Sequence, residues 1–322
     1  MAAQEKPHCK VEEPTDSERN DDNDEVIVVE LRSDMISVDL TQHRIEKIEG
    51  FDFLTQVESL CLRWNLIKKI ENLNSLTTLT ELDLYDNQIV KIENLDSLVN
   101  LETLDLCFNR IEKLENLENL KKLKTLYLVH NKISKIEGLS ELKNLEYLEL
   151  GDNRIKRIEN LEENQELQRL FLGANQIKKI ENLGHLKKLE VISLPANFIV
   201  NIEGLEELTS VREVYLMQNG IQDIRGFDSN QKIETIDLSD NRIEKVKNIK
   251  NLRRLKDFWV RQNKIASWSL VDELSELPDL NHVYLEGNPI SAKPDYRARA
   301  IRLLPQISQL DNDTCRSDIP QI

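Results

Sequence analysis

Apolar residues recur along this chain with a period of 22 positions, and one polar residue marks each period. Within residues 79–98 the apolar positions are Leu79, Leu82, Leu84, Ile89, Ile92, Leu95 and Leu98. The marker is asparagine, and a three-residue insertion precedes its last occurrence. The series is Asn65, Asn87, Asn109, Asn131, Asn153, Asn175, Asn197, Asn219, Asn241, Asn263 and Asn288, with His43 at the same phase one repeat earlier.

The repeated unit reads L-x-x-L-x-L-x-x-N-x-I, which is the pattern of leucine-rich repeats. Its L-x-L portion predicts a short strand whose two leucines point inward, and the asparagine amide is expected to satisfy backbone groups at the following bend. Short repeats leave little room for long helices. We therefore predict an α/β solenoid of horseshoe form, with a concave parallel sheet of about 12 short strands, a convex side of 3₁₀ turns and short helices, and a C-terminal cap.

The repeat divides the chain into three parts. Residues 1–34 are acidic and poor in apolar side chains, so we expect a disordered tail. Residues 35–290 hold twelve repeats of 22 residues. Residues 291–322 leave the period for a helix-like stretch closed by proline, and we expect them to cap the open end of the solenoid. At the N-terminal end of the repeats, we expect the cap to begin at either residues 26–29 or residues 35–40.

The charge balance narrows the choice of partners. Lys and Arg number 43 against 58 Asp and Glu, which gives a formal net charge of −15. Such a surface repels phosphate backbones and anionic lipids, so we expect no nucleic acid and no membrane, and a basic protein surface instead. No apolar run approaches the roughly 20 residues of a membrane span, and residues 1–10 lack the apolar core of a signal peptide.

The sequence contains none of the catalytic or nucleotide-binding signatures G-x-S-x-G, H-E-x-x-H, G-x-G-x-x-G or the Walker loop. The five histidines and four cysteines are scattered, and no C-x-x-C pair is present. We therefore predict that the protein is not an enzyme and uses no metal and no cofactor.

The residues between the two leucines of each L-x-L point outward on the sheet. Any one aromatic there could simply pack against its strand neighbour, but five in one row favour a binding surface for an apolar partner with a basic rim. The row is Asp39, Cys61, Asp83, Asp105, Tyr127, Glu149, Phe171, Ser193, Tyr215, Asp237, Trp259 and Tyr284. Flanking positions extend it with Trp64, Tyr85, Asp86, Phe108, Asp152, Asp240, Asp257 and Glu286.

Several short segments are more specific than the general repeat pattern. They are Tyr85-Asp86-Asn87-Gln88-Ile89, Lys135-Ile136-Glu137, Ile158-Glu159-Asn160-Leu161, Phe258-Trp259, Ser267-Trp268-Ser269, Tyr296-Arg297 and Leu304-Pro305. Over residues 35–312 the chain resembles the regulatory-subunit-7 family of leucine-rich-repeat regulators of protein phosphatase 1.

This resemblance implies a non-catalytic regulatory subunit that controls the activity or targeting of the phosphatase. The implied partner is the catalytic subunit of protein phosphatase 1, sometimes together with inhibitor 3, in the nucleus and cytoplasm, and we expect the free chain to be monomeric. The alternative is a leucine-rich-repeat scaffold of another complex, of the spliceosomal or tubulin-folding type. The resemblance assigns partner binding to Tyr127, Glu149, Phe171, Asp237, Asp257, Trp259 and Tyr284, and the outward row adds Asp83, Asp105 and Tyr215.

Overall fold

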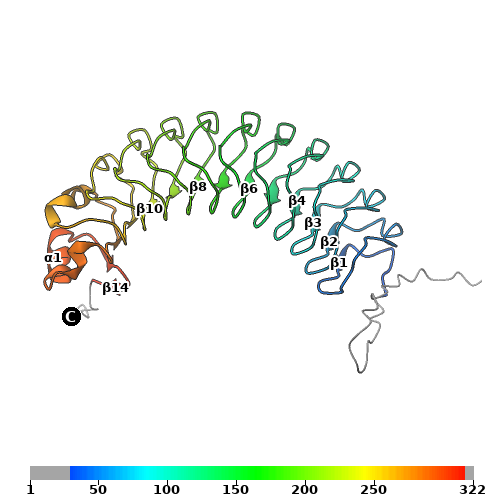
Figure 1. The fold of residues 1–322 in the computed structure, drawn as a ribbon, viewed down its shortest axis with the longest axis horizontal. Coiled ribbons are helices and arrows are strands. Elements are labelled where there is room, and N and C mark those ends of the chain that lie inside the picture. The colour runs from blue at the N-terminus through cyan, green and yellow to red at the C-terminus, as the bar shows by residue number, and fades with distance from the viewer. Residues whose placement is uncertain (1–29, 316–322) are drawn as a thin grey trace, which may run out of the picture. The chain divides into compact units, whose positions relative to one another are not determined.

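Each sequence repeat forms one coil, with a three-residue strand on one side and turns on the other (Figure 1). The computed structural model describes residues 30–315. These residues belong to two units, within residues 1–145 and 146–322. The parallel-strand solenoid predicted from the repeat is confirmed.

The first unit contains five parallel strands in chain order. Neighbouring strands pair in register, so that Leu82 lies opposite Leu104 and Asp83 opposite Asp105. Because paired residues are one repeat apart, each phase of the repeat becomes one row across the sheet. The strands are β1 (Ser37–Asp39), β2 (Ser59–Cys61), β3 (Glu81–Asp83), β4 (Thr103–Asp105) and β5 (Thr125–Tyr127).

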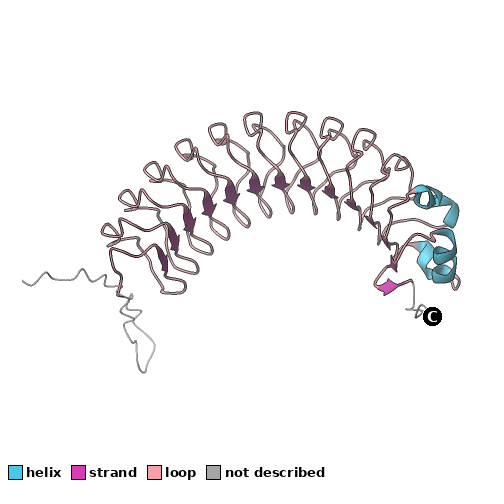
Figure 2. Ribbon diagram, turned by 180° about the vertical axis from the view of Figure 1, so that it is seen from behind, coloured by secondary structure: helices cyan, strands magenta, loops and turns pink. Residues whose placement is uncertain are grey.

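The second unit continues the same pattern and adds a terminal hairpin (Figure 2). Its strands are parallel up to β13, and β14 pairs antiparallel with β13. The repeat strands are β6 (Tyr147–Glu149), β7 (Arg169–Phe171), β8 (Val191–Ser193), β9 (Glu213–Tyr215), β10 (Thr235–Asp237), β11 (Asp257–Trp259) and β12 (His282–Tyr284). The hairpin strands are β13 (Gln309–Leu310) and β14 (Asp313–Thr314).

The core of each unit consists of the periodic leucine and isoleucine side chains. Leu82, Leu84, Ile89 and Ile92 are all fully buried. Burying one such side chain contributes about 1.5–3 kcal/mol, so each coil is held mainly by the apolar edge it shares with its neighbours. In β3 the central residue is buried, whereas the residues on both sides of it face outward. We call the surface made by these outward strand residues the strand face.

The repeat asparagines hold the backbone at the end of each strand, as predicted. The Asn87 Oδ1 atom accepts a hydrogen bond from the Ile67 backbone N–H of the preceding coil at 3.0 Å. Its Nδ2 group donates to the Leu62 and Leu84 carbonyls at 3.0 and 3.1 Å. One side chain therefore satisfies backbone groups of two successive coils, which explains why the residue recurs with the repeat.

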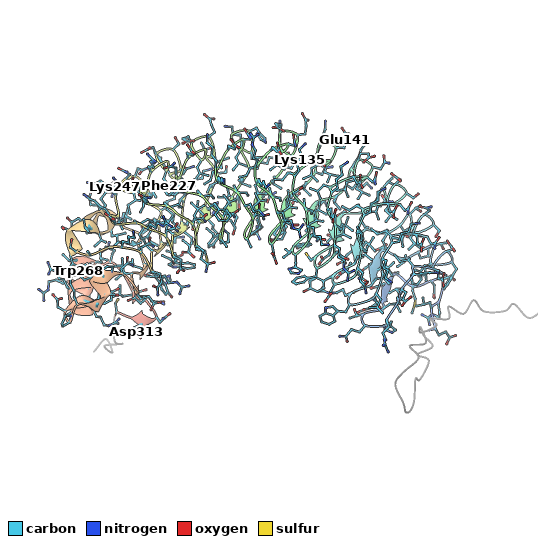
Figure 3. All side chains as sticks on the ribbon, viewed as in Figure 1. Lys135, Glu141, Phe227, Lys247, Trp268 and Asp313 are labelled. Atoms are coloured by element: carbon cyan, nitrogen blue, oxygen red, sulfur yellow. The ribbon has the colours of Figure 1, made fainter. Side chains whose placement is uncertain are left out.

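The side opposite the strands is built from turns. Hydrogen bonds from Leu76 N–H to the Leu73 carbonyl and from Leu79 N–H to the Leu76 carbonyl close single 3₁₀-type turns. Lys135 lies on this side (Figure 3). Its ammonium pairs with Glu137 at 3.5 Å, and such a solvent-exposed pair contributes little to stability. Within residues 30–315 the 3₁₀ helices lie only near the C-terminal end: η1 (Trp268–Leu270), η2 (Asp272–Glu276) and η3 (Pro289–Ala292).

The C-terminal cover combines the predicted helix, α1 (Tyr296–Leu303), with the β13–β14 hairpin, which the sequence did not predict. The Tyr296 ring stacks on Trp268 at 5.7 Å between centroids, and its hydroxyl donates to Asp311 at 2.8 Å. Leu304 and Ile307 are buried in this region. At the other end residues 35–40 contain the first strand, and residues 26–29 lie outside the described part. No helix among the described residues is long and apolar enough to span a bilayer.

Candidate protein-binding surface

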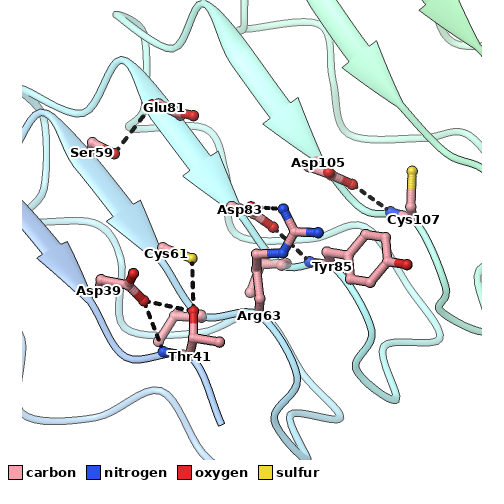
Figure 4. Close-up of polar contacts among 12 residues, drawn as sticks. Asp39, Thr41, Ser59, Cys61, Arg63, Glu81, Asp83, Tyr85, Asp105 and Cys107 are labelled. Atoms are coloured by element: carbon pink, nitrogen blue, oxygen red, sulfur yellow. Dashed lines mark hydrogen bonds and ion pairs between the residues drawn. The ribbon is translucent and has the colours of Figure 1, made fainter.

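The acidic side chains on the strand face of the first unit also support the local backbone. Asp83 accepts a hydrogen bond from the Tyr85 N–H at 3.0 Å, and Asp105 accepts one from the Cys107 N–H at 2.8 Å (Figure 4). Burial is the main cause that raises the pKa of Asp83 above its usual range. These carboxylates therefore have a structural role in addition to the binding role predicted from the sequence.

Aromatic rings form a continuous series beside these strands. Trp64, Tyr85, Phe108 and His130 come from four successive coils, and we call them the aromatic ladder. Their centroids are 6.4 Å apart for Trp64 and Tyr85, 4.9 Å for Tyr85 and Phe108, and 4.8 Å for Phe108 and His130. The repeat phase predicts Trp64, Tyr85 and Phe108 beside the outward row, but it does not predict that their rings touch.

Three ladder residues have an unusual backbone conformation. The φ angle is 54° at Trp64, 54° at Phe108 and 55° at His130, in the left-handed region. For residues with a β-carbon this region costs of order 1–3 kcal/mol, and Asn and Asp tolerate it best. The same position in other coils carries Asp152 and Ala174. An aromatic residue is therefore not what the turn itself requires.

In the second unit the predicted aromatic residues lie on the strand face and are half-buried. Phe171 contacts Tyr147 with centroids 5.1 Å apart, and Trp259 contacts Tyr284 at 5.8 Å. The Tyr284 hydroxyl accepts a hydrogen bond from the Gln309 side chain of β13 at 2.8 Å. The cap thus helps to position the last aromatic residue of the row.

Asp237 lies at the predicted phase but is covered, with only 4% of its surface exposed. It pairs in register with Tyr215 on one neighbouring strand and with Trp259 on the other. The Tyr215 and Trp259 centroids are only 6.5 Å apart, although β10 separates their strands. The two rings therefore close over the carboxylate between them. Asp237 accepts a hydrogen bond from the Ser239 N–H at 2.8 Å.

A hollow lies where a small residue interrupts the aromatic row. Ser193 stands between Phe171 and Tyr215 on the neighbouring strands. The cavity has a volume of about 370 Å³ and is also lined by Arg169, Val191 and Glu213. Such a hollow, flanked by aromatic rings, is suited to receive an apolar side chain of a partner.

Acidic groups accompany the aromatic residues of the second unit. Glu213 accepts a hydrogen bond from the Tyr215 hydroxyl at 2.8 Å, and burial is the main cause that raises the pKa of Tyr215 above its usual range. Asp257 contacts the imidazole of His282 and accepts a hydrogen bond from Thr235 at 3.2 Å. Burial likewise raises the pKa of Glu149.

Part of this surface was not predicted from the sequence. Tyr147, Glu213 and His282 begin their strands and also face outward. Strand alternation could have found them, because the first and third residues of a three-residue strand lie on the same face. Of the residues at the first strand position, only Asp257 was predicted to bind a partner. The half-buried Asp83, Asp105 and Tyr127 occupy the predicted phase on the strand face of the first unit.

Within residues 30–315, no group of three or more His, Cys, Asp or Glu side chains is arranged to hold a metal ion. The described cysteines, Cys61, Cys107 and Cys315, are not joined in disulfide bonds. The chemical character of the strand face in this part of the chain is that of half-buried rings with hydrogen-bonded carboxylates.

Comparison with known families identifies the repeats themselves. The model described as Leucine Rich repeats (2 copies) matches residues 77–119, 99–141 and 121–163. A second model, described as Leucine Rich repeat, matches residues 229–246. Both matched regions lie within the periodic part of the sequence.

Protein phosphatase 1 regulatory subunit 7 of Homo sapiens is 47% identical to the chain over 47 residues. That segment covers 15% of this chain and 13% of the relative. Among solved structures, an internalin of Listeria monocytogenes has a TM-score of 0.77 and 25% identity, covering 92% of this chain and 86% of its own. A leucine-rich-repeat protein of Leptospira interrogans has a TM-score of 0.67 and 24% identity, over 81% of this chain and 74% of its own.

Proposed function

This chain is a leucine-rich-repeat protein, and on that basis we propose that it acts without catalysis, by binding a partner protein on its strand face. The observation that carries this proposal is the surface of the second unit. Phe171, Tyr215 and Trp259 stay half-exposed there, with acidic side chains beside them and a hollow at Ser193. Half-exposed aromatic rings serve no core and are the side chains that most often anchor protein interfaces.

We infer that the partner is the catalytic subunit of protein phosphatase 1. Two arguments support this partner: the 47-residue similarity to a regulatory subunit of that phosphatase, and the sequence phrases quoted above. The acidic and aromatic character of the strand face suits a partner with apolar side chains and basic groups around them. The contacts proposed for the second unit are Glu149, Phe171, Tyr215, Asp257, Trp259 and Tyr284.

Asp237 was predicted from the sequence to contact the partner directly, and the structure suggests a different role. Because the rings of Tyr215 and Trp259 cover it in the free chain, it would reach a partner only if those rings moved. We propose that it mainly holds the strand end and adds negative charge beneath the rings. The strand-face residues Asp83, Asp105 and Tyr127 are proposed as further contacts on the first unit.

The proposal also covers the location of the protein in the cell, its oligomeric state and a third component of the complex. We propose that the protein works in the nucleus and cytoplasm, that the free chain is monomeric, and that inhibitor 3 joins some of its complexes with the phosphatase. We also keep residues 1–34, 35–290 and 291–322 as the proposed tail, repeat array and cap. Imaging of the tagged protein and sedimentation of the free chain test the first two statements.

Surface plasmon resonance with immobilised phosphatase catalytic subunit tests the partner. We expect saturable binding that weakens as salt rises, because opposite charges attract across the interface. Glu213→Lys reverses one charge on the strand face and should slow association, whereas Glu206→Lys reverses an exposed charge elsewhere in the second unit and should not. A phosphatase that does not bind the wild-type chain would refute this partner and favour a scaffold of another complex.

A further inference from the structure

The aromatic ladder of the first unit is an exposed surface that the proposed phosphatase contact on the second unit does not use. Trp64 is 47% exposed and Phe108 is 38% exposed, and their rings connect through Tyr85. Large apolar side chains exposed together on one surface are typical of interaction sites. The ladder is therefore a second candidate surface, which adjoins the proposed phosphatase contact Asp83.

Neither packing in the core nor the conformation of the turn requires aromatic residues at these positions. They are not buried, and the left-handed backbone at Trp64 and Phe108 suits asparagine or aspartate better than an aromatic residue. The coil between them has Asp86 at this position, and later coils have Ala174 and Ala196. An unfavourable residue at an exposed position points to a role in recognition.

The chain itself shows which group the ladder accepts. The Arg63 guanidinium lies 4.2 Å from the centre of the Tyr85 ring and 5.9 Å from that of Trp64. One of its terminal nitrogens also pairs with Asp83 at 3.1 Å (Figure 4). A planar cation is thus held by an aromatic face on one side and a carboxylate on the other, which is a favourable setting for arginine.

The next step along the ladder has a ring and a carboxylate as well, but no arginine within residues 30–315 stacks on the Phe108 ring. Phe108 is partly exposed, and the exposed Asp86, which lines a hollow with Trp64 and Arg44, forms no ion pair with any residue among 30–315. The net charge of −15 favours a cationic ligand over an acidic peptide or a nucleic acid. The unfilled part of the ladder therefore suits a guanidinium supplied by another protein.

We propose that the aromatic ladder docks an extended, arginine-bearing segment of a partner protein. Alternate side chains of an extended segment are about 6.7 Å apart, comparable with the spacing of the rings. The centroids of successive ladder rings are 4.8–6.4 Å apart. Arginines at alternate positions can therefore reach the exposed parts of neighbouring rings, of which Trp64 is the most exposed, while nearby carboxylates hold their charge. The Phe108 face toward His130 is occupied by that ring. This inference does not rest on the phosphatase proposal.

Fluorescence anisotropy with two labelled peptides, Arg-Ser-Arg-Ser-Arg and Lys-Ser-Lys-Ser-Lys, tests the inference on the full chain. The peptides carry equal charge, so the difference between them isolates stacking by the guanidinium. At about 0.15 M salt we expect the arginine peptide to bind at least about fivefold more tightly. Equal affinity of the two peptides would overturn the proposal.

Two variants assign the binding to the ladder. The double variant Trp64→Asn/Phe108→Asn removes two rings but keeps residues that tolerate left-handed backbone, so the fold is retained. The double variant should bind the arginine peptide about tenfold more weakly than the wild type does, and its affinity for the lysine peptide should be nearly unchanged. Phe198→Asn removes an exposed ring of the second unit and serves as the matched control. Unchanged binding in the double variant, or an equal loss in the control, would refute the assignment.

Arg63→Gln gives an independent check that does not depend on removing a ring. The substitution frees the Tyr85 face and Asp83 for an arginine of the ligand. The ratio of arginine-peptide to lysine-peptide affinity should therefore rise, whereas a general gain in negative charge would strengthen both peptides equally. An unchanged ratio would contradict the stacking model.

Discussion

Replacing Asn175 by alanine removes one complete set of the hydrogen bonds that join successive coils. The Asn175 Oδ1 atom accepts from the Ile155 N–H at 2.9 Å. Its Nδ2 group donates to the carbonyls of Leu150, Leu172 and Gly173 at 2.9, 3.1 and 3.1 Å. The side chain is 6% exposed, so water does not readily replace these bonds.

The loss is unequal for the four backbone groups. Leu150 keeps a bond from Asn153, Leu172 keeps one from Asn197, and the Gly173 carbonyl keeps the Asp152 N–H. Within the described residues only the Ile155 N–H loses its sole acceptor. A buried orphaned N–H costs about 1–3 kcal/mol, and the weakened shared bonds add about 1 kcal/mol. We therefore expect the free energy of unfolding to fall by about 3 kcal/mol.

Urea titration followed by circular dichroism measures this loss, and native-state hydrogen exchange locates it. The Ile155 amide should lose most of its protection in the variant, because repeat arrays open locally before they unfold completely. Asn144→Ala is the control, since that exposed side chain makes a single carbonyl bond to Lys121 and its loss should cost under about 0.5 kcal/mol. A loss below about 1 kcal/mol at Asn175, with Ile155 still protected, would refute this account of the asparagine row.

Three further predictions concern the second unit. Because burial raises the pKa of Glu149, its charge destabilises the fold at neutral pH. Glu149→Gln should therefore raise the melting temperature there, and the gain should shrink as pH falls through that raised pKa and vanish below the ordinary pKa of glutamate. Ser193→Trp fills the hollow on the strand face and should weaken phosphatase binding by at least about tenfold in calorimetry while leaving the circular dichroism spectrum unchanged. Deleting residues 291–322 removes α1 and the hairpin, so hydrogen exchange should first accelerate around β12, with aggregation seen by light scattering.

The sequence predicted the strands because one period governs both burial and pairing. Twelve consecutive matches placed β1–β12 correctly, and the asparagine row had the expected hydrogen bonds. The β13–β14 hairpin escaped prediction because Gln309–Leu310 and Asp313–Thr314 lie where the period has ended. Two residues give no alternation from which a strand could be inferred.

The site was less predictable because it depends on side-chain direction. Phase alone placed Asp237 in the open, but the neighbouring Tyr215 and Trp259 rings close over it. Similarly, Tyr85 stands two residues before its repeat asparagine, whereas Phe108 stands one before, so their stacking is not visible in the period. Contacts between different phases need the backbone conformation of each turn, which the repeat pattern does not specify.

Binding of the phosphatase catalytic subunit to the strand face of the second unit is tested most directly by isothermal titration calorimetry of single variants. Phe171→Ala and Trp259→Ala should each weaken binding by about 2 kcal/mol or more, which is roughly 30-fold, because both rings are half-buried and pack against another aromatic ring. Phe198→Ala removes a more exposed ring, 60% exposed and outside the strand face, and should bind like the wild type. Unchanged affinity in both strand-face variants, with their folds intact by circular dichroism, would contradict the account.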